Sequence, residues 1–517
     1  MSVPALDRPW VVAAALGYLA VVLAVGAWSW RRTRSARDFY IAGQGLGVVV
    51  TGLATMSAAF SGFVFLGGPG LTYRIGLGSL MIVAPVGFTA AMLCWVLGKR
   101  LRLLAGVREI YTVPDAVRAR YGSRLATGLA AVAVVVGAVG YLGAQLLALG
   151  RAFEAVFGTR EALGEWSLAA ATAVGLAIVL AYSIAGGMVA GAWTDLIQGV
   201  LMVVAAAAVF IGALAAGGGW GRITESIAAS ERFGPAFLDP LGTVPALTVF
   251  GFVFVFGVGV LGQPHMLHKL YMLRDPRQLR WLPLVLGGSQ SVCLLLWLGV
   301  GLAVPALVAQ GRMAPLANPD DATPAFVLGF LPEALAGLVI AALLAAIMST
   351  ADSLLNLGAA ALARDLPRAL RRGGEEEPVR YDELAAGRWA TLVVALAAAV
   401  CALLYDDLIA LLGTFAFGTF AAALTPALAV GLNWKRVPAV AASASIATGL
   451  VLNLGLELLA RQGALPGLRL PFAAGALPSA VALAGSFTVL FAVTGWHIVR
   501  RLPAPRLDPD VAAVMEA

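Results

Sequence analysis

Uncharged apolar stretches recur along the whole chain, each about 20 residues long, and a helix of that length crosses the hydrocarbon core of a bilayer. Of the 517 residues, 60% are hydrophobic and 12% are charged. Soluble domains carry about 25% charged residues, which they need to cover their surface. The sequence therefore excludes a soluble globular enzyme and predicts an all-α polytopic membrane protein whose outer surface contacts lipid.

The apolar stretches predict 13 membrane spans. We expect them near residues 10–30, 46–71, 76–98, 125–150, 167–186, 194–216, 243–263, 281–307, 331–362, 389–404, 408–431, 439–460 and 473–499. The first stretch is long enough to span and is followed by a basic cluster rather than a cleavage site, so we expect it to remain as a helix.

Lys and Arg are distributed unevenly between the two sides of this arrangement. With the N-terminus outside and the C-terminus inside, 26 of the 35 basic residues fall in inner loops and the tail, as the positive-inside rule requires. Topology thus accounts for the net charge of +7, and we expect no nucleic-acid partner. The two segments that look able to form anything beyond spans, 217–242 and 364–388, are too short for a soluble catalytic domain, so the function is expected to lie within the membrane.

Two spans contain helix-breaking residues. The second has a run of small and hydroxyl residues, Thr51–Gly62, followed by Gly67–Pro69, and the seventh has three glycines before Pro264. Backbone that leaves a helix at membrane depth must be buried in protein or line a cavity. If the chain contains two inverted repeats, these spans begin each of them, which indicates a transporter's binding site. The alternative is that the glycines serve close helix packing.

The ninth span carries hydroxyls and a carboxylate within an apolar helix: Ser349, Thr350, Asp352 and Ser353. Such hydroxyls can simply bond to their own helix backbone. Next to a broken helix, however, they supply oxygen ligands for a small alkali cation. An ionisable residue such as Asp352 within a span is itself a functional hypothesis.

Four motifs extend these observations, and they lie at Asp38–Gly47, Tyr182–Gln198, Gly262–His265 and Met348–Leu355. With these motifs in this order, the chain resembles the sodium:solute symporter family, and the resemblance extends from about residue 36 to at least residue 430. The resemblance implies a leucine-transporter-like core of two inverted five-helix repeats within one transmembrane domain, 1–517. The first helix and its loop (1–36), the repeats (37–216 and 243–435) and the C-terminal helices and tail (436–517) make up that domain.

The resemblance also implies the activity: sodium-coupled symport of a small organic solute by alternating access, across the cell (plasma or inner) membrane, without enzymatic chemistry. The sodium ion is expected to bind to backbone carbonyls and hydroxyls, those of Ser57, Phe60, Ala346, Ser349 and Thr350. Asp195 and Ser353 are expected on the ion's route. The alternative for Asp195 is a carboxylate that stabilises a helix N-terminus.

The candidate substrate residues are sparsely polar: Ser61, Tyr141, Gln145, Phe256 and Gln263. This set suits an amino acid or monocarboxylate better than a sugar, which needs many hydrogen bonds. Phe256 and Val260 stand where sodium/proline members have Trp and Tyr, which argues against proline. Ala59 replaces an aspartate of those members, so coupling to protons instead of sodium stays open.

The remaining expectations concern two histidines and two other possible functions. His265 and His268 are expected to be solvated beside the inner end of the seventh span. A transporter-like solute sensor is a second possible function, and no obligatory protein partner is evident. A serine hydrolase built on Ser61 is disfavoured, because the spacing supplies neither a base nor an oxyanion hole.

Overall fold

The computed structural model describes residues 8–30, 45–371, 383–405, 407–462 and 475–517, and these residues are helical throughout apart from turns, loops and one isolated parallel β-bridge, Leu46–Leu273. The predicted all-α fold is therefore confirmed. Part of the first motif, residues 38–44, and part of the predicted inner loop, residues 372–382, lie outside the described residues.

The first half of the chain contains the following elements. They are α1 (Pro9–Trp30), α3 (Val48–Ala59), η3 (Phe63–Gly67), α4 (Gly68–Ile75), η4 (Gly76–Ile82), α5 (Val86–Met92), η5 (Leu93–Gly98), α6 (Lys99–Val107), α7 (Val113–Tyr121), α8 (Arg124–Phe157), α9 (Thr159–Leu163), η6 (Gly164–Trp166), α10 (Ser167–Gly217), α11 (Trp220–Ala228) and η7 (Pro235–Leu238).

The second half follows with the remaining elements. They are α12 (Ala246–Val258), η8 (Gly259–Gly262), α13 (Pro264–Tyr271), η9 (Pro276–Arg280), α14 (Leu282–Ala309), η10 (Pro319–Asp321), α15 (Ala322–Phe330), α16 (Glu333–Ala360), η11 (Ala361–Asp365), α17 (Leu366–Leu370), α18 (Glu383–Leu404), α19 (Ile409–Thr425), η12 (Pro426–Val430), α20 (Ala439–Gln462), α22 (Pro478–Val499) and α23 (Pro509–Glu516).

Eleven segments of the described chain are long and apolar enough to cross a membrane. Two shorter apolar helical segments, Pro9–Val25 and Val48–Ala59, coincide with the first two predicted spans. The protein is therefore a multi-pass membrane protein. Two candidate spans lie toward the two ends of α10, near the predicted spans 167–186 and 194–216. The helix is continuous between them, where these predicted spans imply a loop.

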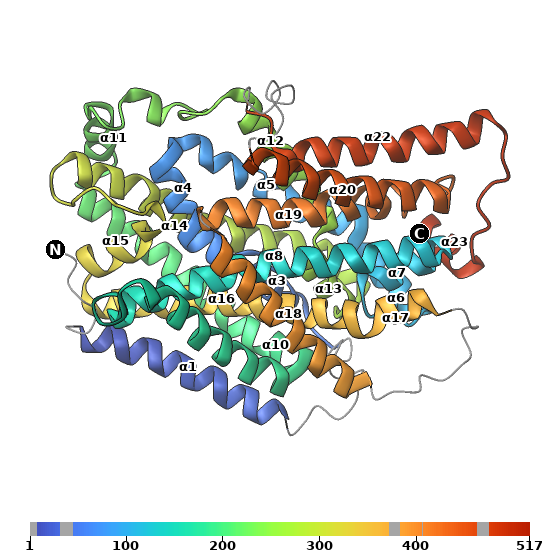
Figure 1. Ribbon diagram of the computed structural model, residues 1–517, viewed down its shortest axis with the longest axis horizontal. Coiled ribbons are helices and arrows are strands. Elements are labelled where there is room, and N and C mark those ends of the chain that lie inside the picture. The colour runs from blue at the N-terminus through green and yellow to red at the C-terminus, as the bar shows by residue number, and fades with distance from the viewer. Residues whose placement is uncertain (1–7, 31–44, 372–382, 406, 463–474) are drawn as a thin grey trace.

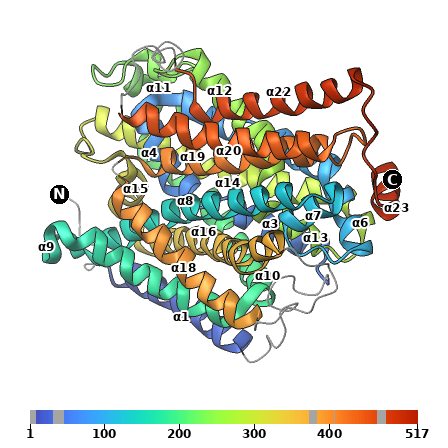
Figure 2. The ribbon, with the colours of Figure 1, turned by 45° about the vertical axis from the view of Figure 1, so that its right-hand side comes forward.

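The helices form a bundle with a buried centre and lipid-facing flanks. α1 and α22 lie on opposite sides of the bundle, with α8 and α16 between them (Figures 1 and 2). The segments that contain α16 and α19 are the most buried candidate spans, at 83% and 89% of their apolar windows. Large apolar side chains are exposed on flanking helices such as α10, α18 and α22, as expected where lipid replaces water.

Both predicted breaks are present, and close packing accounts for their glycines. α3 ends at Ala59, and Phe60 turns the chain into an extended conformation before η3 begins. A Cβ atom added to Gly62 would lie 2.6 Å from the Cβ of Ala148 in α8. In the second break, Gln263 is extended between η8 and α13, and a Cβ on Gly259 would lie 2.4 Å from the Cβ of Ala421. Glycine is needed at both places because a neighbouring helix fills the space.

The two broken helices are joined at one end of the bundle, which we call the α7 end; the opposite end is the α15 end (Figure 1). The Leu46 amide donates to the Met272 carbonyl at 3.2 Å, and the Arg274 amide donates to the Leu46 carbonyl at 2.8 Å. Arg102 of α6 donates to the Leu273 carbonyl at 2.5 Å. The start of α3 and the end of α13 are therefore tied to each other.

The α15 end contains a buried carboxylate outside the candidate spans, that of Asp320 in η10. It accepts the Ile409 amide at the start of α19 at 3.0 Å. Burial raises the pKa of Asp320 from 3.8 to about 7, and this hydrogen bond offsets the effect in part. The folded protein thus keeps a proton that the unfolded chain releases near pH 4. The stability of the fold therefore falls as the pH rises from about 4 to about 7, because the unfolded chain has an ionised Asp320 that must take up a proton on folding.

We predict that Asp320→Asn, which keeps an acceptor for Ile409 and is neutral at every pH, removes this dependence. The melting temperature of the native protein minus that of the variant should decrease by roughly a few degrees between pH 4 and 7. Asp239→Asn, which removes an exposed carboxylate directly after η7, is the control. A difference between native protein and Asp320→Asn that is constant over this range would contradict the assignment.

Candidate functional site

The end of α3 and the middle of α16 form a cluster of buried oxygen atoms. Ser349 Oγ donates to the Ser57 carbonyl at 2.8 Å, and Thr350 Oγ1 donates to the Ala58 carbonyl at 3.0 Å. The Ala346 carbonyl lies 3.0 Å from Ser349 Oγ and 3.3 Å from Thr350 Oγ1. The structure therefore brings together four of the five residues predicted to bind sodium.

The carbonyls point at α16 because α3 stops there. In a continuing helix the Gly62 amide would donate to the Ala58 carbonyl. Here it donates to Gln145 Oε1 of α8 at 3.0 Å, and the next amide, of Phe63, donates to Ser61 Oγ at 3.2 Å. Gln145 and Ser61 thus satisfy the amides on one side of the break, and the α16 hydroxyls satisfy the carbonyls on the other.

Two details differ from the expected ligand set. The Ala58 carbonyl is part of the cluster, although the sequence did not single it out. Phe60 is the C-cap of α3, with φ −96° and ψ 97°, and its buried side chain lines the neighbouring cavity. Binding of sodium by its carbonyl stays a prediction.

The predicted ion route contains a buried ion pair. Asp195 Oδ2 in α10 lies 2.5 Å from Lys269 Nζ in α13, and both side chains are 2% exposed. Asp195 lies inside α10, so the alternative role at a helix N-terminus is wrong. Ser353 is buried on α16, and its hydroxyl has no hydrogen-bond partner among the described residues.

The histidines beside this ion pair are buried, with His265 1% and His268 4% exposed. The expectation that they are solvated is wrong, because α13 packs against α3, α6, α7 and α16 instead of forming part of a loop. The ring of His265 makes an edge contact with Tyr141, with centroids 5.6 Å apart. The α13 segment is thus part of the protein interior.

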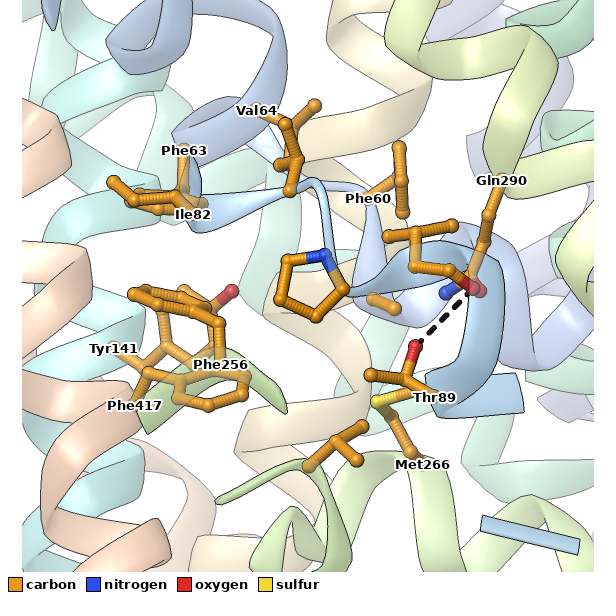
Figure 3. Close-up of a pocket in the computed structure, with 15 residues that line it drawn as sticks. Phe60, Phe63, Val64, Ile82, Thr89, Tyr141, Phe256, Met266, Gln290 and Phe417 are labelled. Carbon is orange, nitrogen blue, oxygen red and sulfur yellow. Dashed lines mark hydrogen bonds between the residues drawn. The ribbon is translucent and has the colours of Figure 1, made fainter. Parts of the chain in front are cut away.

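A cavity of about 60 Å³ lies next to the α3 break (Figure 3). Its lining is mainly apolar: Ala59, Phe60, Phe63, Val64, Ile82, Val83, Pro85, Val86, Thr89, Tyr141, Phe256, Val260, Met266, Gln290 and Phe417. This mainly apolar lining with a few polar groups suits a small solute with an apolar body.

Aromatic rings gather on one side of the cavity and polar groups on the other. Phe256 stacks on Phe417 with centroids 4.4 Å apart, and on Phe63 at 5.6 Å. Figure 3 shows Tyr141, Phe256 and Phe417 together, with Thr89 and Gln290 across from them. The Thr89 hydroxyl donates to the Val86 carbonyl at 3.5 Å, the dashed line in Figure 3.

The predicted substrate residues fall into two groups. Tyr141 and Phe256 line the cavity. Ser61, Gln145 and Gln263 lie at the breaks; Gln263 Nε2 donates to the carbonyls of Gly259 and Phe417, at 3.0 and 3.1 Å. Contact of these three with a solute stays a prediction.

Sequence reasoning missed Thr89 and Gln290, which come from α5 and α14. Gln290 Oε1 is buried and has no hydrogen-bond partner among the described residues. An amide within an apolar span was the available signal for Gln290, whereas nothing in the sequence distinguishes Thr89 from other membrane threonines. The free amide oxygen makes Gln290 a candidate for orienting a solute.

Comparison with known proteins decides the family. The family model for the sodium:solute symporter family matches residues 39–449. This chain belongs to that family. Among curated relatives, the osmoregulated proline transporter OpuE of Bacillus subtilis (strain 168) is 27% identical over 84% of this chain and 85% of its own length. The sodium/pantothenate symporter of Escherichia coli (strain K12) is 26% identical over 87% of this chain and 91% of its own length.

Solved structures show the same fold. A Na⁺-coupled sialic acid symporter in a substrate-bound, outward-open state has a TM-score of 0.74 at 17% identity, covering 96% of this chain and 99% of that one. MHP1, a nucleobase-cation-symport-1 family transporter in a closed conformation, has a TM-score of 0.55 at 14% identity, covering 93% and 99%. The protein has the fold of leucine-transporter-like carriers, and as a sodium:solute symporter it carries out sodium-coupled solute symport.

We predict that Gln290→Leu raises the KM for the transported solute about tenfold, the cost of one lost hydrogen bond in a buried site. The sodium concentration for half-maximal uptake, measured at saturating solute, should change much less than KM, because Gln290 is not among the oxygen atoms of the α3–α16 cluster. Uptake kinetics in proteoliposomes measure both. Gln310→Leu, at the end of the same helix and bonded to Ser226, is the matched control. Equal KM values for the two variants would contradict a role in solute binding.

Proposed function

We propose that this symporter binds sodium at the α3–α16 oxygen cluster and carries a small amino acid or monocarboxylate in the adjacent cavity, by alternating access. The observation that carries the proposal is the meeting of Ser349 and Thr350 with the carbonyls at the end of α3. Ala59, next to these carbonyls, lines the cavity. Ion and solute sites therefore share one helix break, so that filling one affects the other.

The donor set suits sodium. It contains carbonyl and hydroxyl oxygens, the ligands that unwound helices offer to Na⁺ in this class of carrier. The nearby carboxylate of Asp195 is paired with Lys269. The carbonyl and hydroxyl oxygens of the cluster carry no formal charge, which favours a monovalent over a divalent cation.

The lining of the cavity supports a compact solute. None of its residues is Asp, Glu, Lys or Arg, and the polar groups are Thr89, Tyr141 and Gln290. A flat apolar body fits against the Phe256–Phe417 stack, and one polar group of the solute can reach the amide of Gln290. The names of the relatives, which are proline and pantothenate transporters, agree with this class of solute.

The finer architecture follows the same reasoning. We propose 13 spans with inverted repeats at 37–216 and 243–435, flanked by 1–36 and 436–517. α1 begins at the α15 end and α23 lies at the α7 end, as an odd number of spans requires (Figure 1). Lys99, Arg102 and Arg108 of the α7 end fit a cytoplasmic location under the positive-inside rule. The N-terminus is then outside, in the cell (plasma or inner) membrane.

We predict that replacing Ser349 and Thr350 together with alanine raises the sodium concentration for half-maximal uptake at least about tenfold, because two hydroxyl ligands are lost. Uptake into proteoliposomes at varied sodium measures this. Ser445→Ala/Ser486→Ala is the matched control, since these hydroxyls form a buried 2.8 Å pair between α20 and α22. Unchanged sodium dependence in the Ser349/Thr350 variant would place the ion elsewhere.

Thermal stabilisation of the purified protein identifies the solute and the ion in one experiment. A ligand that binds only the folded state raises the free energy of unfolding, by roughly 2.7 kcal/mol when its concentration is a hundred times Kd. The melting temperature rises with it. We expect one amino or organic acid in a panel to stabilise the protein in sodium chloride and not in choline chloride. Stabilisation in choline that grows at low pH would favour proton coupling, and binding without uptake would favour a sensor.

A further inference from the structure

The buried ion pair between Lys269 and Asp195 lies directly behind the proposed sodium ligands. Its two charged atoms are 2.5 Å apart, and the partners come from α13 and α10. Removing charges from water is costly unless they are paired, and removing one partner leaves the other uncompensated. Such a pair is weak evidence for stability, so its position next to an ion site calls for another explanation.

Asp195 is connected to the oxygen cluster through one residue. The Ser57 hydroxyl faces the Asp195 carboxylate, while the Ser57 carbonyl accepts Ser349 Oγ at 2.8 Å. One turn along α10, a Cβ on Gly199 would lie 3.0 Å from the Leu53 carbonyl, so α10 and α3 are in close contact. A charge on Asp195 therefore acts on a cation bound at Ser57.

Other titratable groups surround the pair. Asp352 of α16 acts electrostatically on Asp195 and is held by Ser183 at 2.6 Å and Asn356 at 3.2 Å. On α13 itself, His265 and His268 precede Lys269, by four residues and by one, and are buried. Asp195 and Asp352 thus share one tethered ammonium group.

We propose that Lys269 is a positioning residue that competes with sodium for Asp195 and thereby sets the sodium affinity. With Lys269 bound to Asp195, the carboxylate is neutralised and the cluster holds sodium weakly enough to release it. Without that ammonium, Asp195 attracts the ion and retains it, because charges interact strongly in a buried site. This inference rests on the proposed sodium site.

The location of Lys269 connects this competition to helix movement. Lys269 is carried by α13, and the end of α13 is tied to the start of α3 through the Leu46–Leu273 bridge. A movement of α3 and α13 together relative to α10 changes the Lys269–Asp195 distance. The affinity for sodium then changes when α3, which carries part of the ion site, moves.

The test uses charge-altering variants of the full-length protein, with sodium affinity read from thermal stabilisation by sodium chloride against choline chloride. Lys269→Gln should lower the half-saturating sodium concentration about tenfold and also lower the maximal uptake rate, because release becomes slow. Lys269→Arg keeps the charge and should stay within about threefold of the native protein. Unchanged or weakened sodium binding in folded Lys269→Gln would overturn the proposal.

A second pair of variants covers the case in which Lys269→Gln does not fold. Asp195→Asn leaves the ammonium group facing the site, whereas Asp195→Asn/Lys269→Gln removes both charges. The double variant should bind sodium about tenfold more tightly than Asp195→Asn. Equal affinities would show that the charge of Lys269 does not act on the bound ion and would overturn the proposal.

The Ser349→Ala/Thr350→Ala variant separates this inference from the proposed site. If the sodium affinity of this variant falls while that of Lys269→Gln equals the affinity of the native protein, the proposed site stands and the role of Lys269 is refuted. If neither variant changes sodium affinity, the proposed site itself is refuted, and the Lys269 inference with it.

Discussion

The interruption of α3 at membrane depth is the constraint on which the rest of the structure depends. Lipid offers no hydrogen bonds, so every amide and carbonyl freed by the break needs a protein partner or a ligand. Gln145 supplies the partner for the Gly62 amide, and the hydroxyls of Ser349 and Thr350 supply partners for the carbonyls. The same hydroxyls have lone pairs left for a cation, so one arrangement both satisfies the break and creates the ion site.

The second broken helix uses the same solution with different residues. Gln263 is itself the extended residue at that break, and its amide group donates to the carbonyls of Gly259 and Phe417. Through Phe417, which stacks on Phe256, this bond connects the break to the aromatic side of the cavity. Each broken helix is thus stabilised by one glutamine, and the solute cavity lies beside both of them.

The sequence allowed the helical class, most spans, both breaks and the α16 hydroxyls to be predicted, because hydrophobic length and glycine content report directly on these features. The sequence could not decide whether Gln145 and Gln263 contact the solute or the backbone, since an amide in an apolar span can bind either. Asp195 and Lys269 are 74 residues apart, and their pairing depends on where the bundle places α13 relative to α10. Burial of His265 follows from the packing of α13 against α3, α6, α7 and α16, which the sequence likewise does not reveal.

The central claim is that sodium binds where α3 ends against α16. Density maps recorded from the protein in sodium and in potassium, at a resolution that shows bound ions, test it most directly. The account predicts a peak in sodium alone, bounded by the Ser57 carbonyl and the hydroxyls of Ser349 and Thr350. A map in sodium with no peak there, or with the ion bound at another place, would contradict it.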